Sequence, residues 1–165
     1  LKMSIHSGSD KFAIYPVIGS LIKKYDKGIH VKTAGTTWLE EIIGLAESGG
    51  EGLDFAKEIY TGSLKKIADL TAPYSDVIDI NVSSLPPADE VAKWSSHEFA
   101  EALEHNPENE RYNSNMRQLV HVAYKLAADR KDRFYKLLES NEKVISKCVY
   151  ENIYKKHICR LFDIS

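Results

Sequence analysis

The sequence has few of the features that mark secreted or membrane proteins. It contains two cysteines, Cys148 and Cys159, which stand eleven residues apart in one helix-like stretch, too far along its axis to bridge each other. We expect them to be core thiols of a reducing compartment. No apolar run approaches the roughly 18 residues that a membrane span needs, and no signal-peptide pattern opens the chain. We therefore expect a cytoplasmic protein without membrane contact.

An excess of charge of one sign is also lacking. The chain has 22 Lys and Arg residues against 24 Asp and Glu residues, a net charge of −2, and no basic block. We therefore expect no nucleic-acid partner. A Walker loop, a Rossmann glycine fingerprint, an HExxH motif and zinc-ribbon cysteine pairs are absent as well. These absences argue against the enzyme classes that short motifs identify.

The hydrophobic pattern that is present alternates between short strand-like and longer helical stretches. With 165 residues, 43% of them hydrophobic, the chain fits a single domain over residues 1–165. Strand-like alternation occurs four times, at residues 2–6, 28–35, 77–83 and 117–125. Each of these strands has apolar residues on one face and polar or histidine residues on the other.

Helical periodicity fills the intervals between the predicted strands. Capping boxes at residues 37–40 ("TWLE") and 95–98 ("SSHE") predict two helix starts. Other helices are expected at about 9–25, at 53–67 and, as one long amphipathic helix, at 134–161, with a polar loop at 105–115.

Four strand–helix units in succession favour an α/β fold with parallel strands. Covered strands of an open doubly wound sheet are apolar on both faces, whereas each strand here is two-faced. We therefore expect the parallel β-α units of a TIM-type barrel, in particular its C-terminal half of about four strands, as a fragment of a longer barrel enzyme. Strand ends near a ligand in an open sheet give a similar pattern, so that alternative stays open.

Three histidines repeat one placement, on the polar face of a predicted strand: His6, His30 and His121. Neutral imidazole is a common ligand of zinc and other divalent metals, and converging strands bring distant histidines together. For any one of them a hydrogen-bonded core histidine is the simpler interpretation, but the repetition favours a shared site. The other histidines lack this context, and we expect them at the surface: His97, His105 and His157.

Lysines accompany two of these histidines, which favours an anionic ligand. Lys32 shares a strand face with His30, and Lys11 follows His6 by five residues. The stretch between His6 and Lys11 is flexible and polar, and its backbone N–H groups and hydroxyls suit substrate oxygens: Ser7, Gly8 and Ser9. Asp10 follows them as an acid or base on a substrate hydroxyl, or equally as a helix cap.

Three motifs carry a resemblance to a known family. "SIHSGSDKFAIYPVIG" at 4–19, "IHVKTAGTTWLEEI" at 29–42 and "RQLVHVAY" at 117–124 resemble the tagaturonate epimerase family of hexuronate breakdown. The similarity runs in order through nearly the whole chain and corresponds to the C-terminal part of longer family members. The chain departs from the family pattern at Ala123 and Lys125, where Thr and Gly are expected.

The resemblance implies a TIM-type barrel that binds a divalent metal, such as zinc or manganese, and interconverts tagaturonate and fructuronate at C4. It implies His6 and His30 as metal ligands, with His121 or a carboxylate from elsewhere as the third, and Asp10 and Lys11 as catalytic residues. Substrate contacts would come from a larger set: Ser7, Gly8, Ser9, Lys32, Thr33 and His121.

Two alternatives to this epimerase remain: a non-catalytic or degenerate barrel fragment, and an epimerase or isomerase of another ketose. An open half-barrel leaves strand edges and a sheet face without partners. We therefore expect it to associate with the missing N-terminal half or with itself, and to lack epimerase activity on its own.

Overall fold

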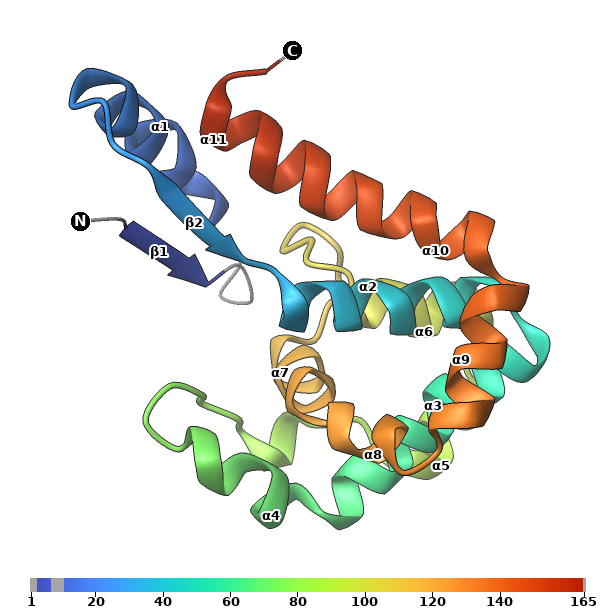
Figure 1. Cartoon of the computed structure of the whole chain (residues 1–165). Coiled ribbons are helices and arrows are strands. Elements are labelled where there is room, and N and C mark those ends of the chain that lie inside the picture. The colour runs from blue at the N-terminus through green and yellow to red at the C-terminus, as the bar shows by residue number, and fades with distance from the viewer. Residues whose placement is uncertain (1–2, 7–10, 165) are drawn as a thin grey trace.

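The chain begins with a parallel β-α-β unit. The computed structural model describes residues 3–6 and 11–164, and Figure 1 shows the strands β1 (Met3–His6) and β2 (Ile29–Lys32) side by side, with α1 (Tyr15–Lys24) between them in sequence. The strands are parallel, with Met3 opposite Ile29 and His6 opposite Lys32. A 3₁₀ turn at Phe12–Ile14 precedes α1. The first two predicted strands and the helix between them are therefore confirmed.

The two strands bury one face and expose the other. Ile5 is buried with Tyr15 of α1 and Leu161 of the C-terminal helix, and Ile29 and Val31 pack against this cluster. Successive residues of a strand point to opposite faces. The other face consequently carries four exposed side chains: Ser4, His6, His30 and Lys32. The alternation predicted for these two strands is confirmed.

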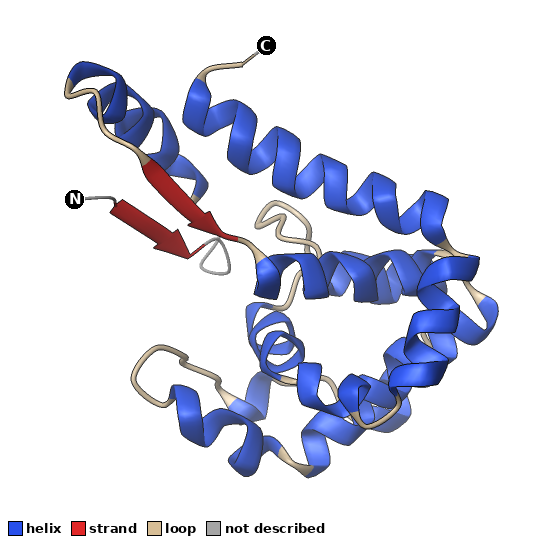
Figure 2. Ribbon diagram, in the orientation of Figure 1, coloured by secondary structure: helices blue, strands red, loops and turns tan. Residues whose placement is uncertain are grey.

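Helices make up the rest of the molecule, as Figure 2 shows. They are α2 (Ala34–Glu47), α3 (Gly50–Lys65), α4 (Ile67–Thr71), α5 (Ala88–Val91), α6 (Ser96–Leu103), α7 (Ser114–Val122), α8 (Tyr124–Ala128), α9 (Lys131–Ser140), α10 (Glu142–Val149), a π-helical segment η5 (Tyr150–Cys159) and α11 (Arg160–Phe162), with 3₁₀ turns at Ala72–Tyr74 and Val82–Ser84. Helix α2 lies at the centre and contacts α3, α6, α7 and α10.

The last helical stretch joins the helical body to the β-α-β unit. Figure 1 shows α10, η5 and α11 running alongside α2 until α11 reaches α1. The long helix predicted at 134–161 is broken at Asn141, where the backbone leaves the helical region and the side-chain Nδ2 donates to Leu137 O at 2.8 Å. The amphipathic stripe was therefore predicted correctly, but the single helix was not.

The predicted strand at 117–125 is wrong, because this segment forms α7 and the start of α8. Asn113 begins α7, and its Oδ1 accepts a hydrogen bond from Met116 N at 2.9 Å. Buried residues recur at helical spacing across both helices: Met116, Leu119, Val120, Ala123, Leu126 and Ala127. The Val-His-Val alternation fits a strand over three residues, whereas the longer pattern has the period of a helix.

The predicted strand at 77–83 is also wrong, because this segment bonds to side chains instead of a neighbouring strand. Gln118 of α7 accepts from Asp79 N at 3.0 Å and donates to Asp79 O at 3.1 Å, and Asn115 Oδ1 accepts from Asn81 N at 2.8 Å. Backbone polar groups need partners, and these amide side chains provide them. Residues 3–6 and 11–164 thus form a mixed α/β structure, mostly helical, with two strands where four were expected.

Of the two predicted capping boxes, the structure contains one. Ser95 Oγ accepts from Glu98 N, and the Glu98 carboxylate accepts from Ser95 N at 2.8 Å, which starts α6 as predicted. This bond from the Ser95 amide is the main reason that the pKa of Glu98 lies below its usual range. Helix α2 instead begins at Ala34, ahead of the predicted box at 37–40, because Thr37 N already donates to Thr33 O at 2.8 Å.

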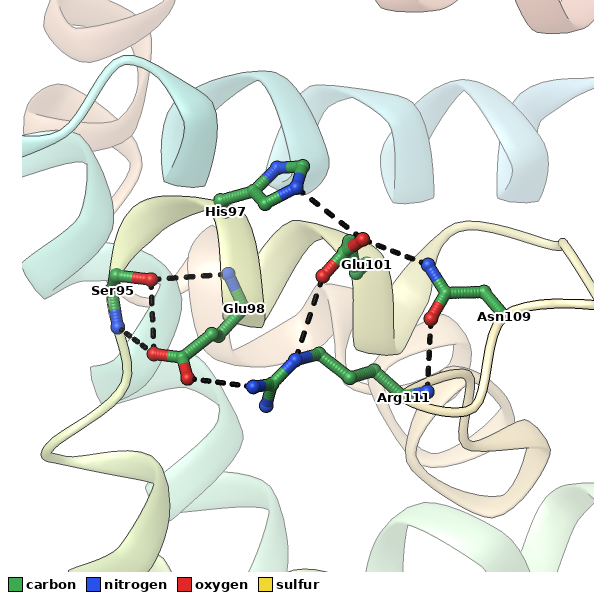
Figure 3. A network of polar contacts seen from close by, with 6 residues as sticks. All are labelled: Ser95, His97, Glu98, Glu101, Asn109 and Arg111. Atoms are coloured by element: carbon green, nitrogen blue, oxygen red, sulfur yellow. Dashed lines mark hydrogen bonds and ion pairs between the residues drawn. The ribbon is translucent and has the colours of Figure 1, made fainter.

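Polar contacts hold the loop after α6 against that helix (Figure 3). Arg111 pairs with Glu98 at 2.9 Å and with Glu101 at 3.5 Å, and Asn109 Nδ2 donates to Glu101 Oε1 at 2.9 Å. His97 lies at the surface, as expected, 3.3 Å from Glu101. None of the helices within the described residues has the length and apolar character that crossing a membrane requires.

Candidate functional site

The carboxyl ends of β1 and β2 bring together three of the predicted site residues. His6 and Lys32 are opposite each other in the parallel register, and His30 lies opposite Ser4, two residues before Lys32. All three side chains are on the exposed face of the sheet. With the usual strand spacing and rise, the Cα atoms of His6 and His30 are about 8 Å apart, so both imidazoles extend from neighbouring strands on one side.

Part of the predicted site lies outside the described residues, namely Ser7, Gly8, Ser9 and Asp10. Lys11, the first described residue after them, is exposed and begins the 3₁₀ turn, with its carbonyl accepting from Ile14 N at 3.2 Å. Four residues of the sequence thus separate Lys11 from His6.

Helix α2 starts directly after β2 and presents its N-terminus at the same strand ends. Thr33 occupies the N-cap position without a side-chain cap, and Thr37 N is the amide that bonds to its carbonyl. The amides of residues 34–36 therefore have no acceptor within the helix. No acidic residue stands in this first turn. The carboxyl ends of β1 and β2 and the N-terminus of α2 are together called here the corner. The positive end of the helix dipole lies next to Lys32, which makes this corner attractive to an anion.

His121 reaches this corner from α7 and not from a strand. A Cβ added to Gly35, in the first turn of α2, would overlap Nε2 of the His121 ring. One residue before His121, the carbonyl of Val120 accepts from Trp38 Nε1 of α2 at 2.8 Å. The strand predicted for His121 was wrong, yet the fold brings its side chain against the helix that follows β2.

His6 and His30 are the two imidazoles that the strands contribute as possible metal-binding donors. Among residues 3–6 and 11–164, no group of three or more His, Cys, Asp or Glu side chains is arranged to hold a metal ion. His6 and His30 on one face fit two ligands of a divalent ion, and a catalytic site needs at least one more.

Sequence reasoning missed the residues behind this corner. His157, expected at the surface, is fully buried. Glu40 and Arg117 are also buried, and their charged groups approach to 3.9 Å. A charged residue within the apolar stripe was the available signal, since Glu40 directly follows Leu39 and stands two positions before Ile42, where the predicted stripe continues.

Comparison with known proteins gives one consistent result. The family model described as tagaturonate epimerase matches residues 1–161. The tagaturonate/fructuronate epimerase of Thermotoga maritima is 33% identical over 160 residues, which are 95% of this chain and 29% of the relative.

A solved structure agrees with these matches. The crystal structure of the fructuronate-tagaturonate epimerase of Cohnella laeviribosi, complexed with glycerol, superimposes with a TM-score of 0.73 at 27% identity, covering 97% of this chain and 30% of that one. The chain thus spans somewhat less than a third of the length of these relatives. Because the family model covers nearly every residue, the chain belongs to the tagaturonate epimerase family.

Proposed function

We propose that this chain contributes part of the active site of an epimerase that interconverts tagaturonate and fructuronate at C4. One observation carries the proposal: His6, His30 and Lys32 share the exposed face of a parallel sheet, beside the N-terminus of α2. Ligands of α/β enzymes bind outside the carboxyl ends of parallel strands. The family relatives supply the identity of the sugar acids.

Retro-aldol chemistry is the route that the substrate favours. C4 lies beta to the C2 ketone, so enolisation of that ketone does not acidify the hydrogen on C4. In the proposed route, Asp10 removes the proton of the C4 hydroxyl, and the C3–C4 bond breaks to leave an aldehyde at C4 and an enediolate on C1–C3. The aldehyde rotates, the enediolate attacks its other face, and the oxygen at C4 takes the proton back.

The cationic groups of the corner oppose the negative charges of this reaction. Lys32 and the amides at the start of α2 suit the uronate carboxylate, and Lys11 suits the enediolate. Thr33 and His121 stand beside the same amides and provide hydrogen bonds to substrate hydroxyls, together with Ser7, Gly8 and Ser9. Charged and polar groups that are already oriented toward the developing charge lower the activation free energy of the reaction, because they need not reorganise.

His6 and His30 would hold the divalent metal, such as zinc or manganese, that the family implies. Such an ion supplies a Lewis acid for the oxygens of the substrate. Its remaining ligand would come from His121 or from a carboxylate of another part of the enzyme.

Metal titration tests this ligand pair on the chain itself. We expect weak, one-to-one zinc binding by calorimetry, lost on His6→Ala or His30→Ala because each removes half of the imidazole pair. His97→Ala, at an exposed histidine on α6, is the matched control and should bind as the parent does. Equal binding by all three variants would show that His6 and His30 do not share a metal.

Substitution of Lys32 tests the carboxylate contact. Lys32→Met keeps much of the aliphatic stem and removes the ammonium, so the exposed strand end should fold as before. In an enzyme with the whole barrel, we expect turnover of the uronate to fall more than that of the corresponding neutral ketose. Lys24→Met, on the exposed side of α1, is the control. Equal losses for both sugars would leave Lys32 without a role in binding the carboxylate.

The proposal includes a partner that completes the barrel. The two-stranded sheet has open edges, and its polar face is exposed. Because the chain matches less than a third of its relatives, we propose that the rest of such a barrel, or a second copy of the chain, covers this face. A purified chain that turns over tagaturonate as a monomer would contradict this part of the proposal.

A further inference from the structure

We propose that four buried side chains, Glu40, Arg117, Asn152 and His157, act as positioning residues for the candidate site. These four, called here the buried polar unit, connect the elements that carry His121, Gly35 and Lys11. The inference rests on the proposed function only in taking those three residues as parts of one reaction site. The contacts of the unit itself do not depend on the reaction.

The unit is centred on one carboxylate oxygen. Asn152 Nδ2 of the π segment donates to Glu40 Oε1 of α2 at 2.7 Å, and Arg117 Nη2 of α7 lies 3.9 Å from the same atom. Arg117 Nη1 also donates to Leu103 O at 2.6 Å. The exposed fractions of Glu40, Arg117 and Asn152 are 5%, 3% and 2%. Three elements distant in sequence are thus held at a single point inside the protein.

The unit reaches His121 and Gly35 through two helices. Arg117 and His121 are four residues apart on α7 and share a helix face, and Gly35 and Glu40 are five residues apart on α2. The Arg117–Glu40 contact therefore lies about one turn below the place where His121 meets Gly35. The bond from Trp38 Nε1 to Val120 O lies between these two contacts. Any rotation of α7 against α2 would move the His121 ring off Gly35.

The unit reaches Lys11 through His157 and Phe12. His157 Nδ1 bonds to Asn152 O at 3.0 Å, and because a carbonyl only accepts, the proton is on Nδ1. The imidazole meets the Phe12 ring edge-on, with centroids 5.0 Å apart and an interplanar angle of 80°. Phe12 directly follows Lys11, and the Arg160 guanidinium lies 5.4 Å from the Phe12 centroid. The π segment therefore fixes the position of Phe12, the neighbour of Lys11.

Stability alone does not account for this arrangement. A buried ion pair contributes little beyond what apolar residues of similar volume would contribute. Asn152 Oδ1 and His157 Nε2 are, in addition, buried acceptors without a hydrogen-bond donor among the described residues. Such groups have a cost in free energy. The π-helical backbone from which both project is uncommon and occurs frequently at functional sites.

Nuclear magnetic resonance on the chain tests the proposal without any substrate. The readouts are the amide resonances of Lys11 and Gly35 and the ring resonances of His121. We expect Asn152→Leu and Glu40→Gln to shift all three. Glu58→Gln is the matched control, because it removes an ion-paired carboxylate, 2.6 Å from Arg133, from a partly exposed position on α3, and it should shift none.

A double variant separates positioning from stability. Glu40→Leu combined with Arg117→Met removes both charges and should recover most of the stability that Arg117→Met alone loses, with only the hydrogen bonds of Asn152 Nδ2 and Leu103 O still missing. We expect the three site resonances to stay displaced, and turnover in a whole-barrel enzyme to be lower by about tenfold, as is typical when groups that orient ligands are removed. Recovery of both stability and resonances would overturn the proposal.

The outcomes of this experiment are distinct from those of the proposed function. Parent-like resonances in folded Asn152→Leu or Glu40→Gln protein would also overturn the inference, whether or not the enzyme acts on tagaturonate. Should Asn152→Leu fail to fold, Glu40→Gln and the double variant still decide the question. Displaced resonances in an enzyme that leaves tagaturonate unchanged would contradict the assigned reaction and leave the positioning role intact.

Discussion

Arg117→Met is expected to lower the free energy of unfolding by about 3–5 kcal/mol, because it leaves the buried Glu40 carboxylate without its cation. Methionine fills much of the same volume, so the loss measures the uncompensated charge more than a cavity. The carbonyl of Leu103 also loses the donor that lies 2.6 Å away. Urea unfolding of the purified chain, followed by circular dichroism, measures the change.

The control for this prediction is the same substitution at an arginine whose side chain is 39% exposed. Arg133→Met removes the ion pairs of α9 with Glu51 and Glu58, at 3.2 Å and 2.6 Å, where water screens the charges. We expect a loss of about 0–1 kcal/mol there. Similar small losses for both variants would mean that Glu40 is solvated or protonated once Arg117 is gone.

Gly35→Ala is expected to reduce turnover by about 100-fold in a full-length epimerase that contains this chain, since the new Cβ must displace the His121 ring. The helix itself gains from alanine, so the melting temperature should change little. The expected pattern is therefore a large loss of activity with nearly unchanged stability. Steady-state kinetics and thermal unfolding of the same variant measure the two effects.

Two other glycine substitutions separate a site effect from a general one. Gly62→Ala, in α3, meets only the side-chain Cδ1 of Leu126 at 3.2 Å, so it should keep both activity and stability. Gly19→Ala meets the backbone carbonyl of Leu161 and should lower stability. Full activity of Gly35→Ala would show that His121 takes no part in the reaction or adapts without cost.

The β-α-β unit was predictable because its signals are local. Residues 2–6 and 29–32 alternate over the whole length of a short strand, and one amphipathic helix joins them. Each strand buries its apolar face against neighbours that are close in sequence, apart from Leu161. The cap of α6 was predictable for the same reason, since Ser95 and Glu98 contact each other within one turn.

The segments at 77–83 and 117–125 were not predictable from alternation alone. A strand forms only where another strand offers hydrogen bonds, and here Gln118 and Asn115 bond to the backbone of Asp79 and Asn81 instead. Both halves of this contact were assigned to strands because three or four alternating residues fit either structure. The helical spacing of Met116, Leu119 and Val120 was the better indicator.

The candidate site was predictable only in its local part. His6, His30 and Lys32 follow from the face of a strand, whereas the approach of His121 to Gly35 joins residues 86 positions apart in the chain. The burial of His157 depends on where the last helix meets Phe12. A single sequence contains no local signal for such contacts, which are set by how helices pack.

The π segment η5 also restricts how many residues can connect α10 to α11. Each residue of an α-helix turns the next side chain by about 100°, and the wider turns of η5 accommodate additional residues before α11 begins. Leu161 is buried in the cluster with Tyr15, and its carbonyl lies against Gly19. Deleting one residue from 150–159 would rotate Leu161 out of this contact by about a quarter turn or more. Insertions and deletions should therefore be tolerated in the polar loop at 105–112 but not in this partly exposed helix.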